Sequence, residues 1–148
     1  MTLLYIIEDD PMMADCMALA VHSTVKEPTR IEIFHDAVTA MQAVNEELPD
    51  IILLDVLLSG PDGFTFLNEM ISYHDTARVP IILVSSLDLS HRDLSHYGVV
   101  QILDKATMTP EDIAAAIELA RKPSLTEAEI IPAPDSALSH FNQKLKDE

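Results

Sequence analysis

The sequence contains one cysteine, Cys16, no tryptophan, and only nine lysines and arginines among its 148 residues. A single cysteine cannot form an internal disulfide, which excludes a disulfide scaffold and is typical of a protein from a reducing cytosol. Cys16 has helical spacing with apolar neighbours such as Met17 and Val21. We therefore expect it to pack in a core rather than to react.

The scarcity of basic residues leaves a net charge of −16, because 25 aspartates and glutamates oppose them. Such a surface repels nucleic acids and anionic lipids, so neither is an expected partner. No apolar run approaches the roughly 18 residues that a membrane-spanning helix needs. The N-terminus enters a strand at Leu3 without a basic stretch or a cleavage site, so we expect no signal peptide and a cytoplasmic location.

Five short apolar runs alternate with stretches of helical periodicity, which predicts an α/β fold: a five-stranded parallel sheet with helices on both faces. For five such units the simplest topology is the flavodoxin-like strand order 2-1-3-4-5. Apolar residues make up 48% of the chain, enough for a core without metal or disulfide staples. The expected strands are residues 3–7, 30–35, 51–54, 81–84 and 99–103.

Polar residues that can cap helices precede four of the helical stretches. The first helix is expected over residues 10–25 and the second over 37–47, and the third should point Phe64, Leu67, Met70 and Ile71 at the sheet. A further helix is expected over residues 88–97, ended by Gly98, with only Leu89 and Leu94 buried, which makes it the weakest element. The expected caps are Asp10, Asp36, Asp62 and Thr109, the last of which begins the final helix.

We expect one domain over residues 1–122, followed by a C-terminal tail over residues 123–148. Within the tail, Leu138, Phe141 and Leu145 would share one face of a short helix. That helix could dock against the domain or against a second copy in a homodimer. The tail could equally be a frayed end.

Polar groups follow four of the five apolar runs. In the predicted topology these strand ends meet at one edge of the sheet, so the carboxylates of Glu8, Asp9 and Asp55 should lie close together. When carboxylates crowd in this way, either the pKa of one of them is raised or the group binds a cation. Hard oxygen ligands suit Mg²⁺. Ser85 ends the fourth run, and Lys105 follows the fifth. The six histidines are scattered without metal-ligand spacing, and we expect them to be surface residues.

With these residues in place, the chain resembles the receiver domain of two-component response regulators over about residues 2–122, and a stand-alone receiver in particular. The turn at 60–63 also resembles the loop that follows the phosphorylation site in that family. The resemblance implies Asp55 as the phosphoacceptor, with Ser85 and Lys105 binding the phosphoryl oxygens. It implies Mg²⁺ as the cofactor. Its ligands would be Glu8, Asp9, Asp55 and the main-chain carbonyl of Leu57.

The function that the resemblance implies is a phosphorylation-dependent signalling switch rather than an enzyme with an external substrate. The chain would catalyse only its own phosphorylation and dephosphorylation. The phosphoryl group would come from a phosphohistidine on a sensor histidine kinase or a histidine phosphotransfer protein, and the changed surface would bind a downstream protein target.

Several positions depart from the family pattern. Ala106 follows Lys105 where receivers usually have a proline in a cis peptide, and Ile102 stands where they usually have an aromatic residue that takes part in switching. Leu57 and Leu87 lie two residues after Asp55 and Ser85, beside the path of the hydrolytic water in this family. Neither side chain can hydrogen-bond that water, so we expect slow dephosphorylation.

Three other functions share part of this pattern. A flavin- or nucleotide-binding domain needs a loop rich in Gly, Ser or Thr after the first strand, and here that loop is Glu8-Asp9-Asp10. An aspartyl-nucleophile phosphatase of the haloacid dehalogenase type needs a second Asp at position 57, which is Leu. A degenerate receiver that binds partners without phosphorylation stays open, although all five chemical positions are filled.

Overall fold

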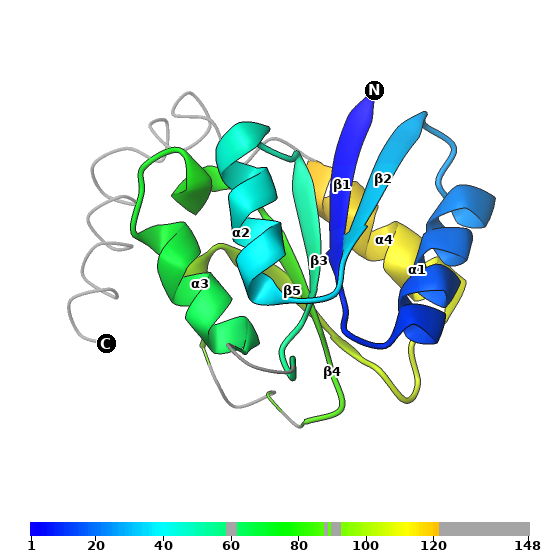
Figure 1. The fold of residues 1–148 in the computed structure, drawn as a ribbon. Coiled ribbons are helices and arrows are strands. Elements are labelled where there is room, and N and C mark those ends of the chain that lie inside the picture. The colour runs from blue at the N-terminus through cyan, green and yellow to red at the C-terminus, as the bar shows by residue number, and fades with distance from the viewer. Residues whose placement is uncertain (59–61, 88, 90–92, 122–148) are drawn as a thin grey trace, which may run out of the picture.

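The computed structural model describes residues 1–58, 62–87, 89 and 93–121, and its strands form one parallel sheet in the order β2-β1-β3-β4-β5 (Figure 1). The predicted flavodoxin-like fold class is therefore confirmed. Every strand pair is parallel. The strands are β1 (Thr2–Ile7), β2 (Thr29–Phe34), β3 (Ile51–Asp55), β4 (Ile81–Ser85) and β5 (Val99–Asp104).

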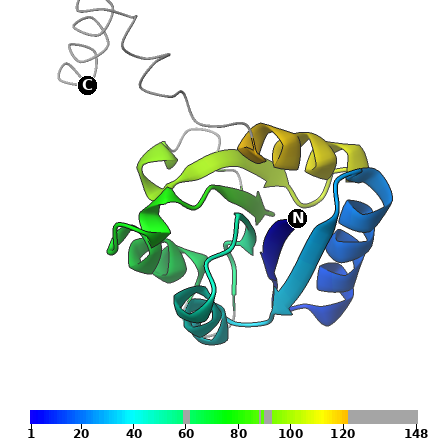
Figure 2. The ribbon, with the colours of Figure 1, turned by 90° about the horizontal axis from the view of Figure 1, so that it is seen from above.

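The helices cover both faces of the sheet, as expected (Figures 1 and 2). Helices α1 and α4 pack on one face, and α2 and α3 pack on the other. None of the helices in the described ranges is long and apolar enough to span a membrane. The helices are α1 (Pro11–Thr24), α2 (Ala37–Glu46), α3 (Gly63–Ile71) and α4 (Pro110–Arg121), with 3₁₀ turns η1 (Thr76–Arg78) and η2 (Ser95–Tyr97).

The three central strands are completely buried, whereas the edge strands β2 and β5 are mostly half-buried. The full burial of β1, β3 and β4 explains why these strands appear in the sequence as unbroken apolar runs, because a strand covered on both faces needs apolar residues at every position. The burial also fixes the register of β1, β3 and β4. Because these strands are parallel, their carboxyl ends meet at one edge of the sheet.

The four predicted helix caps form hydrogen bonds of the expected kind. Asp10 accepts a hydrogen bond from the amide of Met12. Asp36 and Asp62 each accept one from the amide three residues later, that of Thr39 and Thr65 respectively. Thr109 and Asp112 bond reciprocally, with the Thr109 hydroxyl accepting from the Asp112 amide and the Asp112 carboxylate accepting from the Thr109 amide. Each bond satisfies an amide at a helix start that would otherwise lack a partner.

The prediction for Cys16 was wrong, because its side chain is exposed. Helix α1 is apolar on two sides: Ala14, Met17, Ala20 and Val21 are buried, whereas Met12, Cys16 and Leu19 form an exposed stripe. With apolar residues around most of the helix, spacing alone could not identify the inner face. In α3, Leu67 and Met70 are buried as expected, but Phe66 is buried in place of Phe64 and Ile71, which are half-buried.

The helix predicted over 88–97 is not present in the described part of that stretch. Leu89, Asp93 and Leu94 are not helical, and only the turn η2 forms, with Gly98 in the left-handed region at φ 83°. Leu89 and Leu94 are buried as expected, but their spacing of five cannot give a continuous helical stripe. Asp93 instead accepts hydrogen bonds from the amide and the hydroxyl of Ser95, which competes with helix formation. Residues 88 and 90–92 lie outside the described residues, as does the predicted tail 123–148.

Candidate functional site

The predicted site residues meet at the carboxyl edge of the sheet, at the lower end of the strands in Figure 1. Ile7 pairs with Leu54, so Glu8 follows β1 at the level of Asp55 on β3. Asp55 pairs in turn with Val84, which places Ser85 one residue farther along β4. The main-chain N–H of Lys105 donates to the Ser85 carbonyl at 2.9 Å and joins the end of β5 to the same edge.

Asp55 is buried, with 3% of its surface exposed, and both of its carboxylate oxygens have partners. Oδ1 accepts a hydrogen bond from the amide of Leu57 at 3.0 Å, and Oδ2 accepts one from Lys105 Nζ at 2.9 Å. A buried carboxylate without such partners would be costly. Lys105 therefore compensates the charge of Asp55 and holds its carboxylate at the rim.

Glu8 is fully buried beside Asp55, and Lys105 Nζ lies 2.8 Å from its Oε1. Oε2 accepts a hydrogen bond from the amide of Asp10 at 3.2 Å. Oε1 thus has an ion pair with Lys105 but no hydrogen-bond donor among the residues that the structure describes. This buried oxygen is therefore compensated by charge alone and could also bind a cation.

The electrostatics of the cluster follow from this burial. Loss of hydration raises the pKa of Glu8 to about 7, although the attraction of Lys105 works in the opposite direction. Partial burial lowers the pKa of Lys105, but its interactions with Glu8 and Asp55 outweigh that effect and the net shift is upward. Lys105 therefore stays charged, whereas Glu8 can hold a proton at neutral pH.

Glu8, Asp9 and Asp55 can each offer one oxygen so that all three oxygens lie within 4.8 Å of one another. The structure thus brings together the three carboxylates that the sequence predicted as metal ligands. The fourth predicted ligand, the main-chain carbonyl of Leu57, stays a prediction. The hydroxyl of Ser85 is buried and accepts a hydrogen bond from the amide of Leu87 at 2.9 Å.

The loop around Asp55 is held by a close approach of α3. The amide of Gly63 donates to the carbonyl of Val56 at 3.0 Å, and a Cβ at position 63 would lie 2.6 Å from the Val56 Cα. Glycine is therefore required here by space rather than by backbone angles. Of the departures from the receiver pattern, Ile102 is half-buried against the α2 and α3 side of the core, and the described residues contain no cis peptide.

Sequence reasoning missed one contact of the site. His35, the residue after β2, is exposed as predicted, but its Nδ1 lies 2.9 Å from the main-chain oxygen of Glu8. The two residues are 27 positions apart, and only the pairing of β1 with β2 brings them together. His22, His74 and His96 are exposed, whereas His91 and His140 lie outside the described residues.

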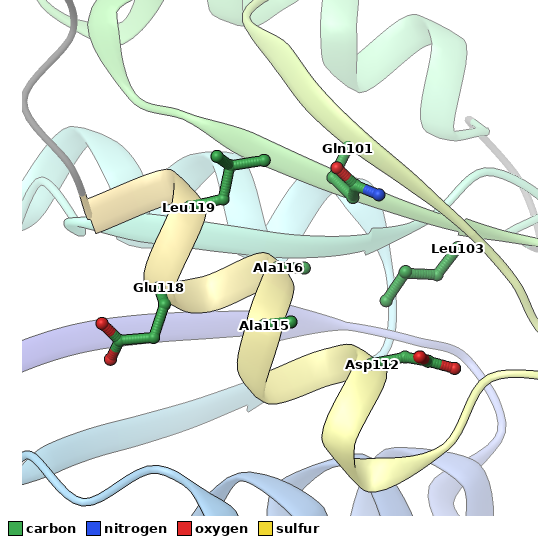
Figure 3. A pocket seen from close by; sticks show the side chains of 7 residues that line it. All are labelled: Gln101, Leu103, Asp112, Ala115, Ala116, Glu118 and Leu119. Carbon is green, nitrogen blue, oxygen red and sulfur yellow. The ribbon is translucent and has the colours of Figure 1, made fainter.

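A separate shallow groove lies between α4 and β5, lined by residues that include Gln101, Leu103 and Leu119 (Figure 3). Asp112 and Glu118 also line it, and none of the predicted site residues does. The groove has no titratable pair with the proximity of Glu8 and Asp55. We therefore assign the chemistry to the strand ends.

Comparison with known proteins agrees with this geometry. Protein-glutamate methylesterase/protein-glutamine glutaminase 3 of Geobacter metallireducens is 33% identical over 97 residues, which are 63% of this chain and 25% of that protein. Response regulator PleD of Caulobacter vibrioides is 42% identical over 53 residues, 36% of this chain and 12% of that protein. The matches thus cover a quarter or less of these relatives.

Among solved structures, the Mn²⁺-bound form of response regulator Rcp1 superposes with a TM-score of 0.67 at 18% identity, over 85% of this chain and 99% of that one. At that identity the likeness shows the fold. The family model of the response regulator receiver domain matches residues 4–118. The chain therefore belongs to the response regulator receiver domain family.

Proposed function

We propose that this receiver is a phosphorylation-dependent switch in which Asp55 accepts a phosphoryl group from a phosphohistidine. The observation that supports this most directly is the arrangement around Asp55: a buried carboxylate at a strand end, bonded to Lys105 and next to a second buried carboxylate. Buried carboxylates are uncommon, and the raised pKa of the neighbouring Glu8 is of a kind that is frequent at functional sites. The chain would catalyse only its own phosphorylation and dephosphorylation, in the cytoplasm.

The residues present fit a divalent cation. Glu8 Oε1 is buried, with an ion pair to Lys105 but no hydrogen-bond donor among the described residues. Glu8, Asp9 and Asp55 can each offer one oxygen within 4.8 Å of the other two. An all-oxygen set with few protein ligands suits Mg²⁺, which keeps part of its water shell. We propose Glu8, Asp9, Asp55 and the Leu57 carbonyl as ligands. When bound, the ion would neutralise charge on the transferring phosphoryl group.

The transfer itself needs little from the protein beyond position and charge. The Asp55 carboxylate attacks phosphorus, so that a new O–P bond forms while the N–P bond of the phosphohistidine breaks. The departing imidazole nitrogen takes up a proton. Lys105, already 2.9 Å from Asp55 Oδ2, would balance the negative charge that arrives, and the Ser85 hydroxyl would donate to a phosphoryl oxygen.

The surface next to the site offers a place for the donor protein. Helix α1 begins directly after the acidic loop, and its exposed stripe of Met12, Cys16 and Leu19 runs away from the rim. Exposed apolar side chains in a row are typical of protein–protein contacts. We propose that the histidine kinase or phosphotransfer protein covers this stripe while its phosphohistidine reaches Asp55.

Incubation with acetyl phosphate or phosphoramidate, with and without Mg²⁺, followed by intact mass measurement tests the proposal. We expect one phosphoryl group on the wild-type protein with Mg²⁺, and none on Asp55→Asn. Asp104→Asn, at an exposed acid one residue before Lys105, is the matched control and should be labelled normally. Labelling of Asp55→Asn, or labelling undiminished by a chelator, would contradict the assignment. A folded wild-type protein that takes up no phosphate would favour the degenerate receiver.

A further inference from the structure

His35 places its ring at the end of the neighbouring strand, where the acidic loop begins. Strands β1 and β2 are paired up to Ile7 and Phe34, and the amide of Glu8 continues this ladder by donating to the Phe34 carbonyl at 2.9 Å. One residue farther, the His35 Nδ1 lies 2.9 Å from the Glu8 carbonyl oxygen. A carbonyl oxygen can only accept, so Nδ1 must carry the hydrogen in this contact.

The bond from His35 completes a set of restraints on Glu8. The Glu8 amide is held by Phe34, its carboxylate Oε2 by the amide of Asp10, and its carbonyl by His35. Strand pairing supplies the first restraint and the local loop supplies the second. The third depends on a single side chain that comes from a different part of the chain.

The carbonyl that His35 holds belongs to the peptide unit between Glu8 and Asp9. A peptide unit is planar, so fixing its oxygen also fixes the direction of the Asp9 amide and Cα. Glu8 is kept in place by burial, whereas Asp9 is only partly buried and lies on the loop that leaves the sheet. The orientation of this peptide therefore decides where the Asp9 carboxylate stands relative to Glu8 and Asp55.

We infer that His35 is a positioning residue for the acidic pair: its Nδ1–H holds the Glu8–Asp9 peptide in the orientation that lets both carboxylates bind a divalent cation. The inference rests on the proposed metal site. His35 would not touch the cation or the phosphoryl group. It acts through the main chain of Glu8, and it should therefore affect affinity for the cation rather than the chemical step.

Three substitutions separate this role from a general structural one. His35→Ala removes the donor. His35→Asn keeps an N–H donor at nearly the position of Nδ1, because both nitrogens are bonded to Cγ, whereas His35→Gln carries its N–H one bond farther out. His22→Ala, at an exposed histidine near the far end of α1, is the matched control. Melting curves without Mg²⁺ establish that each variant is folded.

The Mg²⁺ dissociation constant is measured by calorimetry on the full chain. Loss of one neutral hydrogen bond predicts about three- to tenfold weaker Mg²⁺ binding for His35→Ala. His35→Asn should recover most of that loss, and His35→Gln should not. In phosphoramidate labelling, the Mg²⁺ concentration for half-maximal rate should rise by the same factor for His35→Ala, while the rate at saturating Mg²⁺ changes less than about twofold.

A second measurement without the cation tests the orientation directly. The backbone amide resonance of Asp9 should shift in metal-free His35→Ala and return toward its wild-type position in His35→Asn. Wild-type affinity in His35→Ala, no recovery in a folded His35→Asn, or a lower saturated rate with unchanged affinity would each overturn the inference. A wild-type protein that binds no Mg²⁺ would instead contradict the proposed function. The two failures are therefore distinguishable.

Discussion

The lifetime of the phosphorylated state should be long, and two leucines are the reason. The amide of Leu57 bonds to Asp55 Oδ1 at 3.0 Å, and the amide of Leu87 bonds to Ser85 Oγ at 2.9 Å. Each side chain therefore starts next to the group that would carry or bind the phosphate. Leu57 is 50% exposed and Leu87 is 47% exposed, so both stand at the solvent side of the site.

Hydrolysis needs a water molecule held in line with the O–P bond, and aliphatic side chains can neither hold it nor accept its proton. One hydrogen bond that positions this water is worth about 1.4 kcal/mol, which is about tenfold in rate. We therefore expect the double variant Leu57→Asn, Leu87→Glu to lose phosphate at least about tenfold faster than wild type. Independent contributions from the two positions would bring the factor nearer a hundredfold.

The assay is the decay of phospho-protein by intact mass after removal of the small-molecule donor, at saturating Mg²⁺. Leu119→Asn is the control, because Leu119 has the same exposure as Leu87 but lines the groove between α4 and β5. Wild-type phospho-protein that decays within seconds, or a double variant with the wild-type lifetime, would refute the reasoning.

Four further results are expected. Burial raises the pKa of Glu8 to about 7, and the cation needs the ionised form. Calorimetry should therefore show Mg²⁺ affinity rising about tenfold from about pH 6 to about pH 8. A Glu8→Gln variant that keeps this rise would contradict the assignment of the pH dependence to Glu8. The folded state holds this proton more tightly than the unfolded state, so the stability of the metal-free protein should fall as pH rises through about 7. Gly63→Ala places a Cβ 2.6 Å from the Val56 Cα and should cost about 1–3 kcal/mol in denaturant unfolding, whereas an unchanged midpoint would mean that α3 moves freely. Leu19→Glu should slow phosphotransfer from a histidine donor but not from acetyl phosphate, and equal slowing of both would remove the docking role of α1.

The buried strands and their polar ends could be predicted from the sequence because both follow from one physical requirement. A central strand must be apolar throughout, so the first residue that is not apolar marks the rim. Asp55, Ser85 and Lys105 were found in this way, and parallel pairing then brought them together. The helix caps were predictable for a similar reason, since each depends on a hydrogen bond within a few residues.

The parts that sequence reasoning missed depend on packing between distant segments or on weak patterns. Cys16 was misplaced because α1 is apolar on its outer side as well, and no local rule distinguishes the two sides. In the described part of the stretch around Leu89 and Leu94, which has few apolar residues, Asp93 forms local hydrogen bonds with Ser95 in place of a helical turn. The contact of His35 with Glu8 depends on the register of two strands.

The Ser85 hydroxyl links the chemistry of the site to the chain beyond β4. Its oxygen accepts the Leu87 amide in the present structure, and a hydroxyl can accept one hydrogen bond while donating another. A phosphoryl oxygen that takes the Ser85 hydrogen would therefore leave the Leu87 bond in place and polarise it, forming a two-bond chain from phosphate to backbone. A shift of the Ser85 hydroxyl on phosphorylation would therefore change the Leu87 amide first. Ser85→Ala would then give a protein that still carries the phosphate but whose Leu87 amide no longer responds to it.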